Sequence, residues 1–172
     1  MTIAFAVERL ADVWDEFRFL AMCHWSETDM ARNGEVLDIS KSRYLQYGDA
    51  YLLFTVRDDG RLVGQCGAYV TPSMHTQELI ATEDALYFLP EARKGRRMLD
   101  FHKFMIKELK ARGAAKVFVT AAPYNGVCRM LEYMGYRLSC YKYELDLTIR
   151  SSLGADSIVT AQPVTEPDHV LA

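Results

Sequence analysis

The sequence predicts a single α/β domain with a mixed, mostly antiparallel, twisted sheet and helices on both of its faces. The chain has 172 residues, of which half are hydrophobic and a quarter charged, as in a globular domain with one core. Hairpin-forming strands fill the first half, and the second half alternates strand and helix. After Arg150 the composition changes. We therefore expect a domain over residues 1–150 and a C-terminal tail over residues 151–172.

The first elements are a strand and two helices. Residues 3–7 have the character of a short strand. Apolar residues then recur at three- and four-residue spacing over 8–21, which predicts an amphipathic helix. Residues 23–37 are predicted to be a loop and connector. Ser40 is expected to cap a second short helix that ends near Gln46.

Three antiparallel strands follow, at residues 51–57, 62–70 and 78–89. The segment between the first two, Asp58-Asp59-Gly60-Arg61, predicts a hairpin, because glycine tolerates the positive φ of a tight turn. Pro72 weakens the end of the second strand, and Pro90 ends the third.

The remaining elements are a helix, a buried strand, a short helix and a strand, at residues 96–112, 116–121, 125–134 and 136–147. Gly113 and Gly135 are predicted to end the two helices. The tail after Arg150 has no aromatic residue, lysine or arginine, and residues 157–161 form its one candidate strand. We expect the tail to dock on a second copy of the chain, as in a homodimer, or to close the sheet edge.

Composition excludes several classes of protein. The formal net charge of −3 and the pI of about 5.8 disfavour nucleic-acid binding, which needs a basic surface. No apolar run is long enough to span a bilayer, and acidic residues follow the N-terminus too early for a signal peptide. A cytoplasmic location is expected. The cysteines have no metal-ligand spacing and are expected to be reduced and mostly buried, with no metal bound: Cys23, Cys66, Cys128 and Cys140.

A basic loop between a strand and a helix is the most informative segment. It reads Pro-Glu-Ala-Arg-Lys-Gly-Arg-Arg-Met-Leu over residues 90–99. Unpaired amides at a helix N-terminus, four cationic side chains and Gly95 together suit an anion, most naturally a phosphate group. The alternative is a solvated basic turn that only starts the helix.

This segment resembles the acetyl-CoA pyrophosphate loop of the GNAT N-acetyltransferase superfamily. A later segment, Asn125 followed by Leu131-Glu132-Tyr133-Met134-Gly135-Tyr136, is similar to the same superfamily's late Asn and Leu-Tyr-Glu-Lys-x-Gly-Phe pattern. The order of elements over residues 2–147 also matches, so the resemblance covers most of the chain. Within the superfamily, the loop is most similar to a subgroup encoded by bacteriophages.

The resemblance implies roles for particular residues. Backbone groups of Leu86, Tyr87 and Phe88 would bind the pantetheine arm, and Asn125 would lie near the sulfur of the cofactor. The pyrophosphate would be cradled by Arg93, Lys94, Gly95, Arg96, Arg97 and Met98. Two departures from the pattern are present. The loop keeps only one glycine, and Leu131 stands where a tyrosine often protonates the leaving thiolate.

The reaction implied is direct transfer of an acetyl group from acetyl-CoA to an amine, with no covalent enzyme intermediate. It needs a base, because an ammonium cannot attack a thioester. Glu83 and Asp84 are the candidate bases, with Glu83 preferred, although the commonest family position falls on Thr82. Adjacent carboxylates in an apolar strand are costly unless they are paired or functional. The alternative is an ion pair with an arginine, and His75 is a substitute base.

The acceptor is left open as a small molecule, a protein or a modified nucleotide. Trp14, Trp25 and Tyr44 lie in the segment that forms the acceptor lid in GNAT folds. Two other functions remain as alternatives. One is a CoA-binding regulatory or assembly module without catalysis, which Leu131 and the reduced loop favour. The other is a nucleic-acid adaptor, which the acidic pI opposes.

Overall fold

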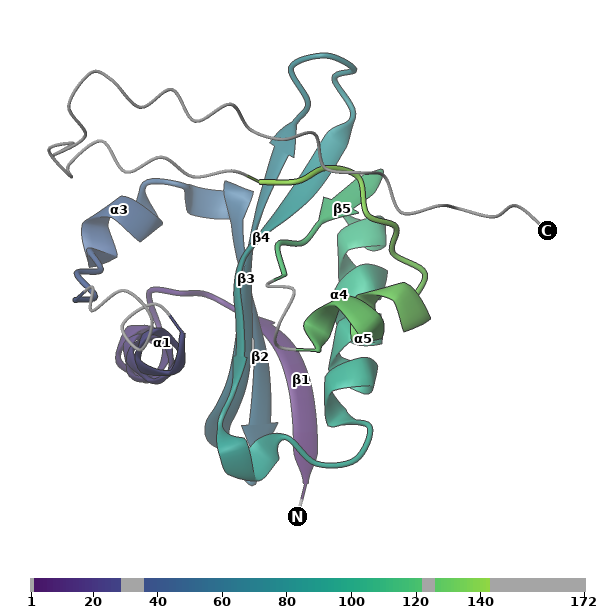
Figure 1. The fold of residues 1–172 in the computed structure, drawn as a ribbon. Helices are drawn as coiled ribbons and strands as arrows, with labels where there is room; N and C mark the ends of the chain where they lie inside the picture. Colours follow the sequence, from purple (N-terminus) through teal and green to yellow (C-terminus); the bar gives the residue numbers. More distant parts are fainter. Residues whose placement is uncertain (1, 29–35, 122–125, 143–172) are drawn as a thin grey trace, which may run out of the picture. The chain divides into compact units, whose positions relative to one another are not determined.

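A five-stranded sheet forms the centre of the structure, a computed structural model that describes residues 2–28, 36–121 and 126–142 (Figure 1). The strands occur in chain order: β1 (Ile3–Glu8), β2 (Tyr51–Asp58), β3 (Arg61–Pro72), β4 (Leu79–Phe88) and β5 (Lys116–Phe118). The first four pair antiparallel, and β5 runs parallel to β4. The predicted mixed, mostly antiparallel sheet is confirmed.

The helices are α1 (Trp14–Glu27), α3 (Lys41–Leu45), α4 (Arg97–Ala111) and α5 (Val127–Tyr133), with 3-10 turns η1 (Gly48–Ala50) and η2 (Pro90–Ala92). The chain divides into two compact units, Met1–Cys128 and Arg129–Ala172. The sheet, α1, α3 and α4 all belong to the first unit.

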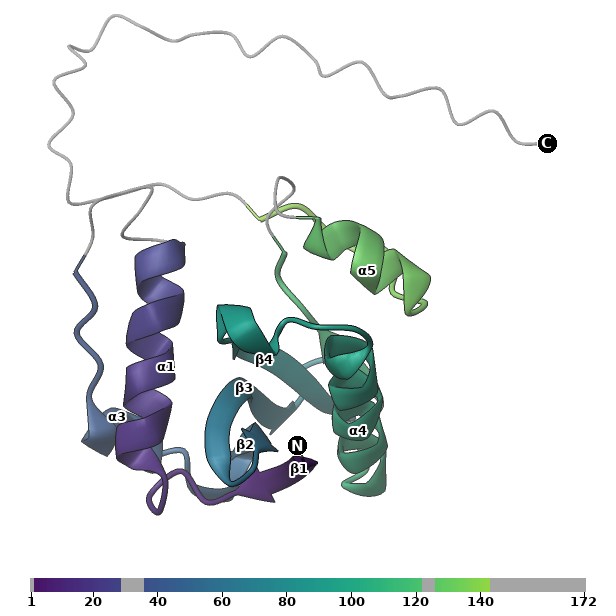
Figure 2. The same ribbon diagram turned by 90° about the horizontal axis from the view of Figure 1, so that it is seen from below.

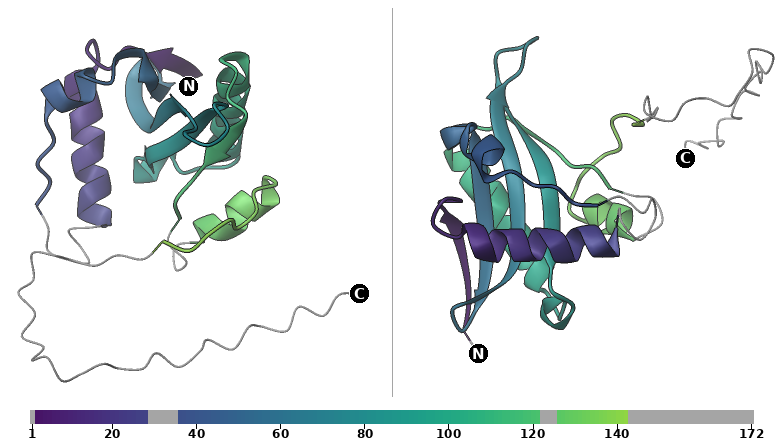
Figure 3. Two further views of the ribbon diagram at one scale, coloured as in Figure 1. Left: turned by 90° about the horizontal axis from the view of Figure 1, so that it is seen from above. Right: turned by 90° about the vertical axis from the view of Figure 1, so that its left-hand side faces the viewer.

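Helices cover both faces of the sheet, as predicted. α1 crosses the strands on one face and α4 lies on the other (Figures 2 and 3). Strand alternation supplies an apolar surface to each helix. On the α4 side, the rings of Phe101 and Phe88 are in contact, with 5.4 Å between their centres, and both side chains are almost fully buried. On the α1 side, Phe17 packs in a cluster with Tyr51 and Leu53.

α4 ends as the sequence predicts. Gly113 has a φ of +84° and donates its amide to Lys110 O at 2.9 Å, while the amide of Ala114 reaches Leu109 O at 3.0 Å. These two bonds satisfy carbonyls that the end of a helix leaves unpaired. Gly135, at φ +90°, ends α5 with the same pair of bonds, from Gly135 to Glu132 O and from Tyr136 to Leu131 O.

Two predictions for the first half were wrong in detail. α1 begins at Trp14, because residues 9–13 form turns first, and it runs on to Glu27 through residues predicted to be a connector. No glycine or proline interrupts residues 14–27, so helical hydrogen bonding continues. Ser40 does stand at the N-cap of α3. Its hydroxyl is 2.9 Å from that of Ser42 and bonds no helix amide.

The strands of the second half are shorter than predicted. β5 spans three residues, and Lys116 and Phe118 are exposed, so the prediction of a buried strand was wrong. β5 pairs with β4 over only three residue pairs, so no sheet hydrogen bonds extend the strand beyond Phe118. Residues 136–142 form no strand. Residues 143–147, the candidate strand at 157–161 and the tail at 151–172 lie outside the described residues.

Candidate functional site

A β-bulge in β4 ends the pairing between β4 and β5. Glu83 pairs with Ala68 of β3 and Ala85 pairs with Gly67, so Asp84 is an extra residue with no cross-strand partner on β3. A bulge bends its strand and increases the local twist. The parallel ladder with β5 includes only Ile80, Ala81 and Thr82 and stops just before this point. The second half of β4 therefore has no β5 partner.

The unpaired edge of β4 presents backbone groups. The amide of Leu89 donates to Val63 O on β3 at 2.9 Å. Because an antiparallel ladder alternates, Tyr87 also faces β3, whereas the N–H and C=O groups of Leu86 and Phe88 face away from it. Phe88 O accepts a hydrogen bond from Arg93 Nε at 2.8 Å. Within the described residues, the Phe88 amide and both backbone groups of Leu86 have no backbone partner on this edge.

β4 leads through η2 to the N-terminus of α4. Among the described residues, the amides of Gly95, Arg96, Met98 and Leu99 have no backbone acceptor. Gly95 has a φ of +59°, and a Cβ placed on it would meet no atom within 4 Å. Four amides without a backbone acceptor, an open glycine and the positive end of the helix dipole are the features that suit an anion.

The four cations of the loop fall into two pairs. Arg93 Nη2 lies 2.6 Å from Glu27 Oε2, and its guanidinium stacks 5.1 Å from the centre of the Tyr87 ring. Arg97 pairs with Asp58 at 3.3 Å. Lys94 and Arg96 are exposed and form no ion pair within the described part of the chain. These two cations are the ones left to bind an external anion.

The two candidate bases lie on opposite faces of the sheet, as neighbouring residues of a strand do. Glu83 pairs with Ala68, which lies on the α4 face with Leu52 and Phe54. Asp84 lies on the α1 face, where its Oδ2 accepts hydrogen bonds from the hydroxyls of Tyr44 and Tyr51, each at 3.1 Å. The two predicted carboxylates are thus adjacent in β4 but lie in different environments, one on each face of the sheet.

Glu83 has the environment of a base that works near neutral pH. The residue is half-buried, its Oε2 is fully buried, and that oxygen has no hydrogen-bond partner in residues 2–28, 36–121 or 126–142. Burial, and then the charge of Asp84, raise the pKa of Glu83 to about 7. No ion pair with a described arginine forms, contrary to the alternative considered from sequence.

The tyrosines around Asp84 keep their protons. Burial and the Asp84 carboxylate raise the pKa of Tyr69 to about 12, and the same two causes raise the pKa values of Tyr44 and Tyr51 further. All three phenols therefore remain hydrogen-bond donors at neutral pH. Gly67 makes room for this arrangement, because a Cβ there would overlap the hydroxyl of Tyr51.

Other predicted residues lie elsewhere or outside the described residues. Trp14 contacts Tyr44 at 6.1 Å between ring centres, and Trp25 is in the last turns of α1. His75 lies in the turn between β3 and β4, at the opposite end of β4 from the basic loop. Asn125 is outside the described residues. Leu131 is in α5, part of the second unit.

The cysteines form no disulfide, and Cys66 alone of them is fully buried. Within the described ranges, no three His, Cys, Asp or Glu side chains gather as metal ligands would. Nor is any helix in those ranges both long and apolar enough to cross a membrane.

Sequence reasoning missed Tyr51, Tyr69 and Glu27 as parts of this region. Tyr51 and Tyr69 are directly opposite each other in the β2–β3 ladder. A tyrosine at the start of one strand and another near the end of its hairpin partner was a signal that the two rings would meet. Glu27 had no such signal, because it reaches Arg93 and Tyr87 only through the extension of α1.

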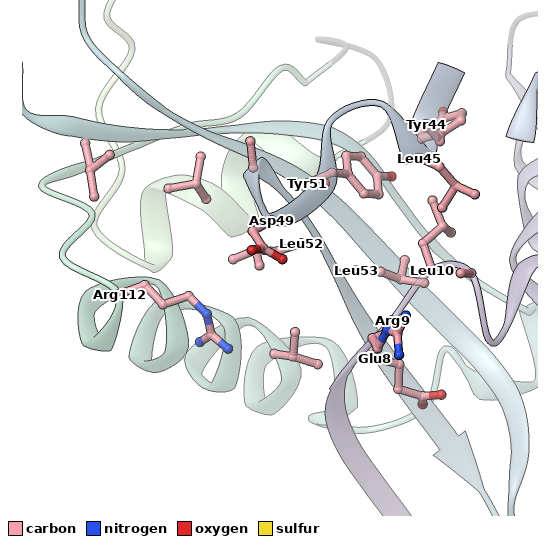
Figure 4. A pocket seen from close by; sticks show the side chains of 16 residues that line it. Glu8, Arg9, Leu10, Tyr44, Leu45, Asp49, Tyr51, Leu52, Leu53 and Arg112 are labelled. Atoms are coloured by element: carbon pink, nitrogen blue, oxygen red, sulfur yellow. The ribbon is translucent and has the colours of Figure 1, made fainter. Parts of the chain in front are cut away.

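A cavity of about 840 Å³ opens beside the first residues of β2. Its walls come from β1 and the residues after it, α3, η1, β2, one residue each of β3 and β4, and Arg112 after α4. The side chains of Arg112, Asp49 and Leu52 point towards it in Figure 4. Tyr44 and Tyr51 also line it, while their hydroxyls bind Asp84, so the cavity adjoins the surroundings of Asp84.

Comparison with solved structures shows the fold. An aminoglycoside acetyltransferase from an uncultured soil metagenomic sample is 16% identical, with a TM-score of 0.68, over 86% of this chain and 100% of that one. A ribosomal-protein-alanine N-acetyltransferase from Brucella melitensis biovar Abortus 2308 is 20% identical, with a TM-score of 0.65, over 85% and 99%. AAC(6')-Iy, in complex with a CoA-S-monomethyl-acetylneamine bisubstrate analogue, is 14% identical, with a TM-score of 0.61, over 84% and 100%.

The chain therefore has the GNAT acetyltransferase fold that the sequence predicted. No protein-family model matches the chain, and no curated protein matches it in sequence.

The raised pKa of Glu83 predicts a pH-dependent stability. A carboxyl group with a higher pKa in the folded than in the unfolded state costs stability as pH rises from about 4.5 to about 7. We expect Glu83→Gln to leave the free energy of unfolding nearly unchanged at pH 4 and to raise it at pH 8, by up to about 3 kcal/mol. Chemical denaturation at the two pH values measures this.

The exposed carboxylate of Glu91 supplies the control, since Glu91→Gln should show no such gain at pH 8. Equal effects of Glu83→Gln at both pH values would contradict the buried, proton-binding state of Glu83.

Proposed function

We propose that this protein is an N-acetyltransferase that moves an acetyl group from acetyl-CoA to an amine. The observation that carries the proposal is the bulge at Asp84, which frees one edge of β4 directly before an anion site at the start of α4. A thioester whose diphosphate lies at that helix would extend its pantetheine arm along the free edge. The acetyl group would then reach the bulge, where Glu83 is located.

The residues present fit acetyl-CoA. The amides of Gly95, Arg96, Met98 and Leu99 and the side chains of Lys94 and Arg96 would hold the pyrophosphate, and Leu86 and Phe88 would pair with the pantetheine. Arg93 and Arg97 would hold the loop in place through Glu27 and Asp58. Similarity to AAC(6')-Iy, whose bound analogue contains CoA, supports this cofactor. Asn125, outside the described residues, keeps its proposed place near the sulfur.

Acetyl-CoA supplies the acetyl group as an activated thioester. Glu83 takes the proton that the amine loses while the new C–N bond forms and the C–S bond of the thioester breaks. Its pKa of about 7 suits this step, because a base is most effective when its pKa lies near the working pH. The unpaired Oε2 can accept the proton directly or through one water molecule.

No tyrosine stands at the Leu131 position to protonate the thiolate. A free thiol has a pKa of about 8.5, so a thiolate can leave near neutral pH and take its proton from water. The sequence departure at Leu131 is thus compatible with catalysis at a reduced rate.

A CoA-binding module without catalysis is the second candidate. The single glycine of the loop and Leu131 favour it. The unpaired Oε2 of Glu83 opposes it, because burying a carboxyl group without a hydrogen-bond partner costs free energy, and a protein that only binds CoA gains nothing from that cost. The nature of the acceptor, the cytoplasmic location and the bacteriophage-related subgroup stay predictions.

Binding of acetyl-CoA should depend on the two unpaired cations. We expect the double variant Lys94→Ala/Arg96→Ala to weaken CoA binding by about 10- to 100-fold, because each lost charge-assisted contact costs about 1.5–3 kcal/mol before compensation. Isothermal titration with CoA measures this. Lys103→Ala/Lys107→Ala removes the same charge from the exposed side of α4 and should bind normally. If the parent protein binds neither CoA nor acetyl-CoA, the proposal fails.

Turnover should depend on Glu83. We expect Glu83→Gln to lower kcat by about 10²- to 10⁴-fold with CoA affinity unchanged, because the amide cannot accept the proton. Thiol release from acetyl-CoA, followed over an amine panel with mass spectrometry of the products, measures this. Glu91→Gln should keep full activity. If the parent protein binds acetyl-CoA but acetylates no amine in the panel, the non-catalytic module is the better account.

A further inference from the structure

The carboxylate of Asp84 has no arginine partner, unlike three glutamates on the α1 side of the sheet. Glu8, Glu16 and Glu27 each pair with an arginine at 2.6–2.9 Å. Asp84 is exposed, and no lysine, arginine or histidine in the described part of the chain forms an ion pair with it. Its negative charge is therefore open to an external cation.

We propose that Asp84 and the tyrosines beside it form the acceptor site, and that this site binds a second cationic group of the acceptor, one that is not acetylated. The proposal rests on the proposed acetyl transfer and adds the class of substrate: an alkyl diamine or polyamine rather than a neutral monoamine.

The hydrogen bonds at Asp84 leave one oxygen for the ligand. The hydroxyls of Tyr44 and Tyr51 both donate to Oδ2, each at 3.1 Å. No described side chain contacts Oδ1 by a hydrogen bond. Tyr51 is buried and Tyr44 packs on Phe17 at 5.3 Å, so the carboxylate is held in one orientation before any ligand arrives.

Aromatic rings surround the carboxylate. Tyr51 contacts Tyr44 at 5.2 Å and Tyr69 at 5.1 Å between ring centres, both edge to face, and Tyr47 contacts Tyr69 at 4.7 Å. The faces of such rings attract ammonium groups, and edge-to-face packing leaves some faces open. A carboxylate oxygen among tyrosine rings is the chemistry that recognises an alkylammonium ion.

The position of Asp84 fits a binding role better than a role as base. It lies at the same point of β4 as Glu83 but on the α1 face, while Glu83 faces α4. An acceptor that enters from the α1 side would place one ammonium on Asp84 and extend its other amine past the bulge towards Glu83. A substrate with amines at both ends of a short alkyl chain meets this requirement.

The first test is direct binding of 1,4-diaminobutane to the protein without acetyl-CoA, by isothermal titration or ligand-observed NMR. We expect 1,4-diaminobutane to bind and 1-butanol, which has no ammonium group, not to bind. Asp84→Asn should weaken it at least about tenfold, because the charge-assisted contact is lost while the amide oxygen can still accept from the phenols. Tyr47→Ala, at an exposed ring, should weaken it by a smaller factor.

Asp49→Asn is the matched control, since Asp49 lines the cavity beside β2 but forms no hydrogen bond with Asp84 or its two tyrosine partners in the described part of the chain. Normal binding by Asp84→Asn, or a loss with Asp49→Asn instead, would overturn the proposal.

Kinetics then separate this proposal from the proposed function. With 1,4-diaminobutane as acceptor, Asp84→Asn should raise its KM at least about tenfold, with kcat and the KM for acetyl-CoA nearly unchanged. A fall in kcat alone would show that Asp84 acts as the base and would overturn its binding role. If the diamine binds through Asp84 but no acetyl-CoA binds, the transferase function fails while the cation site stands.

Discussion

The bulge at Asp84 is the constraint on which the rest of the site depends. One extra residue in β4 lies just after Thr82, where the parallel ladder with β5 stops. The backbone of Leu86 and Phe88 therefore has no β5 partner. A β5 ladder that continued along β4 would have closed this edge with sheet hydrogen bonds, whereas ordinary strand alternation already places Glu83 and Asp84 on opposite faces.

Ion pairing then determines which charges remain for ligands. Arg93 binds Glu27 and Phe88 O, and Arg97 binds Asp58, so half of the basic loop holds α1, β2 and α4 around the end of β4. Lys94 and Arg96 are left for an anion, and Asp84 for a cation. The proposed diphosphate subsite would then lie at the start of α4, and the proposed ammonium subsite on the α1 face beside Glu83, at the bulge of β4.

The sequence predicted the elements well where local signals are strong. The Asp59-Gly60 turn and the two glycines that end helices, Gly113 and Gly135, all appear as expected, because these depend on positive φ. The bulge was not predictable, since it depends on cross-strand register. Strand alternation already implies that Glu83 and Asp84 lie on opposite faces, but the sequence could not show that Tyr44 and Tyr51 bind Asp84. Nor could it show that Arg93 and Arg97 already have partners.

Amide hydrogen exchange with and without acetyl-CoA tests the central claim most directly. If acetyl-CoA lies along the free edge of β4 and on the N-terminus of α4, it should slow exchange at Leu86, Phe88, Gly95 and Arg96, because these amides have no backbone acceptor on that side. Residues 48–53, beside the cavity at the start of β2, should exchange as before. Binding of acetyl-CoA without protection at these four amides, or with protection only at residues 48–53, would contradict the account.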